Sequence, residues 1–116
     1  PMMRVIVIID GDGYVPGLNF VFGVAQNGWG GIVFLDRLKP EFYGQMPSNT
    51  LYIARIIKEV THELGHSLGL GHCNDRSCVM RFSNSIVDVD SKTSNFCLRC
   101  SLQLERLYPG LIKLLT

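Results

Sequence analysis

The chain has 116 residues, which is enough for one compact domain but not for two. With 47% hydrophobic and only 18% charged residues, it lacks the polar, highly charged composition of intrinsically disordered proteins. Its net charge is +1 and its basic residues are scattered along the chain, so we expect no nucleic-acid partner.

No apolar run in the chain approaches the ~18 residues that are needed to span a bilayer. No signal-peptide pattern precedes the first predicted strand. We therefore expect a cytoplasmic protein that does not associate with membranes, and we predict that it acts as a monomer.

The first predicted element is a strand over residues 3–9, a run rich in Val and Ile. Because it is apolar on both faces, we expect it to lie in a sheet that is covered on both sides. The turn over residues 10–13 resembles the start of a calcium-binding loop, but Tyr14 stands where the third side-chain ligand would be. We therefore interpret these residues as a plain turn.

A β-hairpin is predicted next, with strands over residues 19–25 and 31–37. The turn between them contains Asn27 and Gly28, a pair that favours tight hairpin turns. The glycines of this turn are not followed by Gly-Lys-Ser/Thr, and no helix begins there, so a phosphate-binding loop is not indicated.

One long helix is the strongest element that the sequence predicts. It begins at Ser48 or Asn49, which are both good N-caps, and ends at Gly69, a typical left-handed terminator. Apolar or small residues recur along it at helical spacing: Leu51, Ala54, Ile57, Thr61, Leu64 and Leu68.

The part of the chain after this helix has a weaker pattern. Residues 70–96 contain many turn formers and few periodic signals, so we predict an irregular segment. An irregular segment of this length in a small domain needs an anchor. Helical patterns return over residues 101–107 and 111–115.

All three histidines of the chain lie within eleven residues at the C-terminal end of the long helix. His62 and His66 are four residues apart, so their rings point the same way and can bind one ion. His72 would point away on a straight helix, but Gly69 tolerates a positive φ and lets the chain return it to the metal. Three protein ligands leave a fourth position for water, as in catalytic zinc sites.

Glu63 directly follows the first of these histidines. A carboxylate at this position lies beside the metal without binding it and can accept a proton from a metal-bound water. We therefore predict that Glu63 is a general base beside a catalytic zinc ion, rather than a surface residue between ordinary helix histidines.

The pattern His-Glu-x-x-His-x-x-Gly-x-x-His, which runs from His62 through Gly69 to His72, resembles that of the metzincin zinc peptidases. The sequence that follows is similar to the archaemetzincin family in particular, and residues 19–23 resemble its central strand. The resemblance implies an α+β fold in which a small mixed sheet packs on a long active-site helix. It also implies a Met-turn at Met80, which would otherwise be interpreted as core packing, and a C-terminal helical segment.

Two features depart from the metzincin pattern. Metzincin domains normally begin with a strand, a helix and a further strand, so we predict a single catalytic domain over residues 1–116 that lacks these N-terminal elements. In some metzincins a tyrosine two residues after the Met-turn methionine assists catalysis. This sequence has Phe82 there, which has no phenol to offer.

The four cysteines form two short-spaced pairs, Cys73 with Cys78 and Cys97 with Cys100. This arrangement is close to the paired knuckles of structural zinc sites, and four thiolates would anchor the irregular segment. Two disulfides are the main alternative, which the absence of a secretory leader disfavours, and free thiols are another.

The sequence thus predicts a zinc-dependent peptidase with two zinc ions, one catalytic and one structural. Its substrate would be a peptide or protein, and we expect residues 31–37 to form a sheet edge with which an extended peptide can pair. Three alternatives stay open: a non-peptidase zinc hydrolase, a non-catalytic zinc-stabilised module that binds a peptide or protein, and a fragment that folds but is inactive.

Overall fold

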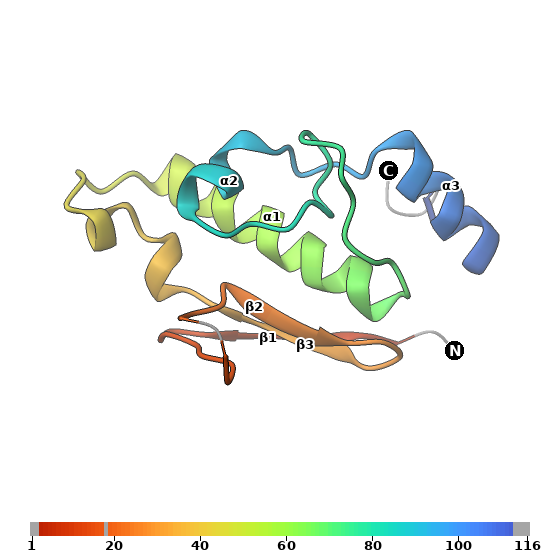
Figure 1. The fold of residues 1–116 in the computed structure, drawn as a ribbon, viewed down its shortest axis with the longest axis horizontal. Helices are drawn as coiled ribbons and strands as arrows, with labels where there is room; N and C mark the ends of the chain where they lie inside the picture. The colour runs from red at the N-terminus through yellow and green to blue at the C-terminus, as the bar shows by residue number, and fades with distance from the viewer. Residues whose placement is uncertain (1–2, 18, 113–116) are drawn as a thin grey trace.

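The computed structural model describes residues 3–17 and 19–112. Figure 1 shows a sheet on one side of the long helix, and the later loops and short helix on its other side. The predicted α+β arrangement, a small mixed sheet packed on a long helix, is confirmed. The elements are β1 (Val5–Ile9), β2 (Gly23–Gln26), β3 (Gly30–Phe34), the 3₁₀ turns η1 (Asp36–Leu38) and η2 (Pro40–Tyr43), α1 (Asn49–Ser67), α2 (Ile86–Ser91) and α3 (Leu98–Leu107).

The three strands are ordered β1-β3-β2, with β1 parallel and β2 antiparallel to β3. The prediction that residues 31–37 form an open sheet edge is therefore wrong. The hairpin occupies one side of β3, and β1 occupies the other. Such a parallel partner arrives from a distant part of the sequence, so the local pattern of β3 does not reveal it. The strand also ends at Phe34, and a 3₁₀ turn follows.

The strand predicted over residues 3–9 is present as β1, but it is not covered on both faces. Val5 is 45% exposed and Ile8 is 51% exposed. β1 lies at the edge of the sheet, and α1 covers only one face, where Ile6 packs into the core. The prediction of a strand is confirmed. The expectation that other elements cover both faces of this strand is wrong for the residues that the structure describes.

The predicted hairpin is confirmed, with shorter strands than expected. Residues 19–22 lie outside β2, and Val21 forms an isolated bridge with Gly13 instead. At the turn, Gly28 has φ of 88°. Gly30 follows with φ of 156°, and a Cβ there would collide with the carbonyl of Val5, so the close approach of β1 depends on this glycine.

α1 begins after Ser48, whose hydroxyl accepts a hydrogen bond from the Leu51 N–H. The helix ends at Ser67, and Gly69 then has φ of 106°, which reverses the chain. The Ser67 carbonyl accepts hydrogen bonds from the Gly28 N–H and from Arg4. The tip of the hairpin is thereby tied to the end of α1.

The chain after α1 is mostly irregular, as predicted, except for α2. α3 begins at Leu98 rather than at residue 101, because Cys97 caps its N-terminus and accepts from the Cys100 N–H. Of the helical pattern predicted over 111–115, residues 111 and 112 are helical and the remainder lies outside the described residues. None of the described helices is long and apolar enough to cross a membrane.

The core divides into two clusters of buried apolar residues. The first lies between the sheet, α1 and α2 and contains Phe22, Val33, Leu38 and Val89. The second surrounds the cysteines and contains Leu68, Leu70, Cys73, Cys78, Val79, Met80, Cys100, Leu104 and Leu111. Each cluster thus supports a different group of candidate functional residues.

Candidate active site

The three predicted histidine ligands come together at the C-terminal end of α1. One ligand nitrogen from each of His62, His66 and His72 lies within 4.8 Å of the others. The Nε2 atoms of His62 and His66 are 3.1 Å apart. Two nitrogens bound to one tetrahedral zinc ion are separated by ~3.3 Å, so this donor set fits the metal.

Hydrogen bonds to backbone carbonyls orient two of these imidazoles. Nδ1 of His62 lies 2.7 Å from the Val79 carbonyl, and Nδ1 of His66 lies 2.8 Å from the Leu70 carbonyl. A proton on Nδ1 leaves the lone pair of Nε2 free to bind a metal, which is the usual arrangement for zinc-binding histidines. Burial lowers the pKa of His62 to about 3, so its ring is neutral and competent as a ligand.

His72 reaches the other two histidines through the chain reversal at Gly69. Its ring centroid lies 5.4 Å from that of His62 and 4.7 Å from that of His66. Burial and the neighbouring His66 lower the pKa of His72. The ring centroid of Phe82 lies 5.2 Å from that of His72, so the residue at this position packs against a candidate ligand.

Glu63 is 4% exposed and lies against the sheet beside the histidines. Burial and the neighbouring Glu59 carboxylate raise the pKa of Glu63 to about 8, although Lys92 opposes this. A Cβ added at Gly23 would lie 2.6 Å from Glu63 Oε2, and one at Gly31 would lie 3.0 Å from Glu63 Cβ. The absence of side chains at these two glycines therefore creates the space that the Glu63 carboxylate occupies.

A cavity of about 770 Å³ contains all of these groups. α1, the segment from Asn19 to β2, and residues 82–84 each supply part of its wall. Glu59, one helical turn before Glu63, also lines it. The candidate catalytic residues therefore face a space that is large enough for several residues of a bound peptide.

Met80, the predicted Met-turn residue, is completely buried. It packs against α1 at Gly65, where a Cβ would overlap the Met80 sulfur. Its neighbour Val79 supplies the carbonyl that orients His62, and the Met80 carbonyl accepts from the Cys73 N–H. The turn that carries Met80 is therefore in contact with the ligand-bearing helix.

The four cysteines converge on one point between α3 and the Met80 turn. Their sulfur atoms all lie within 4.8 Å of one another, with 3.8 Å from Cys73 to Cys97 and 3.7 Å from Cys78 to Cys100. Sulfurs on one tetrahedral zinc ion are ~3.8 Å apart, whereas a disulfide needs ~2.05 Å. The geometry fits a closed four-thiolate site, and all four thiols are free.

The thiols differ in how readily they lose a proton. Burial raises the pKa of Cys78 and, together with the neighbouring thiols, that of Cys100. At Cys97, burial also acts upward, but the Cys100 N–H and the adjacent thiols outweigh it and lower the pKa. Thiolates bind metal and thiols do not, so a bound zinc ion would have to displace the protons of the buried thiols.

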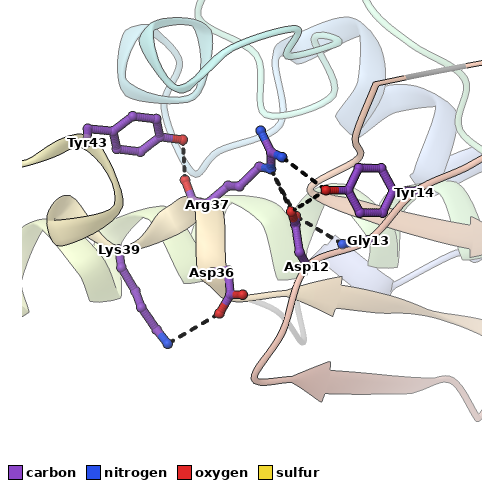
Figure 2. A network of polar contacts seen from close by, with 7 residues as sticks. All are labelled: Asp12, Gly13, Tyr14, Asp36, Arg37, Lys39 and Tyr43. Atoms are coloured by element: carbon purple, nitrogen blue, oxygen red, sulfur yellow. Dashed lines mark hydrogen bonds and ion pairs between the residues drawn. The ribbon is translucent and has the colours of Figure 1, made fainter.

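A polar network holds the wall segment that precedes β2. Figure 2 shows Arg37 reaching the carboxylate of Asp12, which also contacts the Tyr14 hydroxyl. The Arg37 guanidinium also lies 4.2 Å from the ring centroid of Phe20, a residue of the cavity wall. The Arg37 hydrogen bond lowers the pKa of Asp12, so this pair is ionised at neutral pH. Asp12 thus anchors the loop between β1 and β2 through its contacts with Arg37 and Tyr14.

The model of Peptidase family M54 matches residues 2–106. The chain belongs to this peptidase family. Its archaemetzincin relative from Sulfolobus acidocaldarius is 57% identical over 104 residues, which are 90% of this chain and 58% of that protein. The archaemetzincin of Saccharolobus solfataricus is 50% identical over 103 residues, or 89% of this chain and 56% of that protein. The resemblance that the sequence motif indicated is confirmed.

Solved structures of the family have the same fold. The archaemetzincin of Methanopyrus kandleri superposes on this chain with a TM-score of 0.82 at 50% sequence identity. The match covers 90% of this chain and 55% of the Methanopyrus kandleri chain. A zinc-dependent peptidase from Methanocorpusculum labreanum superposes with a TM-score of 0.83 at 40% sequence identity. That match covers 87% of this chain and 53% of the Methanocorpusculum labreanum chain. The chain therefore spans little more than half the length of the family members it matches.

Two polar residues of the site went unnoticed in the sequence. Glu59 lines the cavity from α1, and Lys92 lies behind it at the end of α2. Lys92 Nζ lies 3.2 Å from Glu59 Oε2, and both side chains are almost completely buried. The two residues are 33 positions apart, and no local pattern connects them. Only the position of Glu59, four residues before Glu63, could have suggested that it faces the site.

Proposed function

We propose that this chain is the zinc-binding part of a peptidase that hydrolyses peptide bonds, with His62, His66 and His72 holding a catalytic zinc ion. The observation that carries this proposal is the convergence of three oriented imidazoles beside a buried glutamate in one cavity. When bound, zinc would polarise the scissile carbonyl and lower the pKa of a water molecule. Membership of a peptidase family supports the same reaction class.

Glu63 would act as the general base. Its carboxylate lies at the cavity surface next to the histidines, and burial favours its protonated form. A buried carboxylate of this kind accepts a proton readily and can deliver it to the leaving amine. Phe82 offers no second acid at the place where some metzincins have a tyrosine, so Glu63 carries both proton transfers.

The substrate backbone would pair with β2, which is the strand beside the histidines. The Phe34 N–H donates to the Phe22 carbonyl, so alternate residues of β2 bond to β3. The polar backbone groups of Gly23 and Ala25 consequently point away from β3, and both residues line the cavity. Peptides N-methylated next to the scissile bond should therefore lose turnover, whereas unchanged turnover would contradict this pairing.

The four cysteines would hold a second, structural zinc ion. The buried cluster around them includes Met80 and the residues on either side of the chain reversal, Leu68 and Leu70. Structural zinc binds such sites with an apparent ~10–16 kcal/mol, which is comparable to the net stability of a whole domain. This ion would therefore hold Met80 and His72 in place.

Elemental analysis of the purified chain together with a fluorogenic peptide library tests the proposal. We expect two zinc ions per chain and hydrolysis that a chelator abolishes. Glu63→Ala should keep both ions and lose hydrolysis, because it removes the base and no ligand. A zinc-loaded chain that binds library peptides without cleaving them would indicate a binding module. Cleavage of simple esters but of no peptide would indicate a different hydrolase.

A further inference from the structure

Two polar side-chain atoms without hydrogen-bond partners lie at the cavity of the candidate site. Glu59 is 2% exposed, and its Oε2 makes no directed hydrogen bond with any described residue. Ser83 Oγ is also buried and has no partner among them. Both residues line the same cavity. A buried polar atom without a hydrogen-bond partner destabilises the protein unless a ligand satisfies it.

Lys92 forms a buried ion pair with Glu59. Its ammonium is completely buried, lies 3.2 Å from Glu59 Oε2 and donates to the Arg81 carbonyl at 3.1 Å. Glu59 is among the residues that line the cavity, and Lys92 is not. A carboxylate has about four acceptor sites, so Glu59 retains acceptor capacity toward the cavity.

The charges around Glu59 determine which donor fits best. Lys92 already pairs with Glu59 and supplies one compensating positive charge. Lys58 adds a further positive charge that acts on Glu59. Placing a substrate cation in this partly buried position would increase the excess of positive charge. A neutral side chain that donates a hydrogen bond avoids that cost.

The position of Glu59 relates this subsite to the reaction. Glu59 precedes Glu63 by four residues on α1, so the two side chains lie on one face about 6 Å apart along the helix. That distance is about the reach of one substrate side chain from the scissile bond. The occupant is therefore a side chain of a residue adjacent to that bond.

We propose that Glu59 and Ser83 form a specificity subsite that selects a neutral, hydrogen-bond-donating side chain, namely Ser, Thr, Asn or Gln, next to the scissile bond. This inference rests on the proposed peptidase function. An apolar side chain of the same shape fills the space but donates neither to Ser83 Oγ nor to Glu59, so the subsite rejects it.

Isosteric peptide pairs test the subsite directly. Peptides that differ only as Thr against Val, Asn against Leu, or Lys against Met are placed at each residue next to the scissile bond. At one of these positions, we expect kcat/KM to be about tenfold higher for Thr than for Val and for Asn than for Leu. Equal values, or a preference for Val and Leu, would overturn the proposal. A preference for Lys above Thr and Asn would overturn the neutral-donor assignment.

Variants of the two residues then connect the preference to the subsite. Ser83→Ala removes an oxygen that has no protein partner, so the protein should remain as stable while the Thr:Val ratio falls. Glu59→Gln alone would leave Lys92 buried without a counter-charge, so the double variant Glu59→Leu/Lys92→Met is used. In that variant the preference should reverse toward Val and Leu. An unchanged ratio in both variants would refute the assignment.

A second ion pair provides the matched control. Arg55 and Asp90 also join α1 to α2, at 2.8 Å, but neither residue lines the cavity. The variant Arg55→Met/Asp90→Leu should therefore lower the free energy of unfolding without changing the Thr:Val ratio. If this control changed the ratio as much as Glu59→Leu/Lys92→Met does, the preference would reflect loss of packing rather than a subsite, and the proposal would fail.

Binding measurements separate this inference from the proposed function. The same peptide pairs are titrated calorimetrically into the zinc-loaded Glu63→Ala chain, which cannot use its base. A Kd about tenfold lower for Thr than for Val supports the subsite even if the unmodified chain hydrolyses no peptide. That combination would refute the peptidase activity alone. Equal Kd values for the pair would refute the subsite, whatever the activity.

Discussion

Replacing Gly23 by alanine is the sharpest test of how the fold positions Glu63. The added Cβ would lie 2.6 Å from Glu63 Oε2 and 2.7 Å from the Ile32 carbonyl oxygen. Ordinary contacts of a Cβ begin at 3.4 Å, so the glutamate has to move by about 0.8 Å. The Ile32 carbonyl belongs to the central strand and cannot move without disturbing the sheet.

Two effects of Gly23→Ala should be measurable. Overpacking in a close-packed region typically costs 1–3 kcal/mol, and the lower entropy of the unfolded alanine chain returns about 0.4–1 kcal/mol. We therefore expect the free energy of unfolding to fall by about 1–2 kcal/mol. Displacing a catalytic group by about 1 Å lowers kcat by about 10²-fold. Zinc content should not change, because the three atoms nearest to the new methyl group belong to Glu63 and Ile32 and to none of the three histidines.

Chemical denaturation, elemental analysis and peptide hydrolysis measure these three quantities. Gly71→Ala is the matched control, because it lies next to His72 but has no atom within 4 Å of its added Cβ and no positive φ. That variant should behave as the unmodified chain. A Gly23→Ala protein with unchanged unfolding free energy and unchanged kcat would refute the claim that these glycines position Glu63.

Three further substitutions test the supporting structure. Cys100→Ser should lower the zinc content by one ion per chain and destabilise the buried cluster around it, measured by elemental analysis and thermal unfolding. Ser48→Ala removes the cap that accepts the Leu51 N–H and should cost about 1 kcal/mol in chemical denaturation. Asp12→Asn tests pH dependence: the hydrogen bond from Arg37 depresses the pKa of Asp12, so its stabilisation is present above the unfolded value of 3.8. It is lost as the pH falls through the lower folded pKa. The variant should therefore be less stable than the unmodified chain at pH 7, by up to about 1 kcal/mol, and equally stable in strong acid.

The features that the sequence predicted correctly are those that short-range physics determines. A cap at Ser48 and the left-handed Gly69 bound a helix that has a strong apolar period. The hairpin follows from Asn27 and Gly28 with apolar runs on either side. The convergence of the histidines needed only the helical repeat and one chain reversal. In each case, residues a few positions apart determine the outcome.

The features that the sequence did not predict depend on distant partners. α2 has the sequence Ile-Val-Asp-Val-Asp-Ser, whose β-branched residues disfavour a helix, yet Val89 is completely buried against the first core cluster. Asp90 also pairs with Arg55 of α1, 35 residues away. The position of β3 in the centre of the sheet likewise depends on β1, because each residue of β1 pairs with a residue of β3 that is 25 positions later in the sequence. Tertiary contacts override the local preferences here.

The same close approach of helix and sheet explains why the candidate site lies beside β2 rather than elsewhere along α1. Gly23 and Gly31 both face α1 at Glu63, and they lie on neighbouring strands. A side chain at either position would collide with Glu63, because an added Cβ would lie 2.6 Å from Glu63 Oε2 at Gly23 and 3.0 Å from Glu63 Cβ at Gly31. At Glu63, the carboxylate reaches the backbone of the outer strand. The proposed general base and the proposed peptide-binding edge are therefore brought together by two glycines on neighbouring strands.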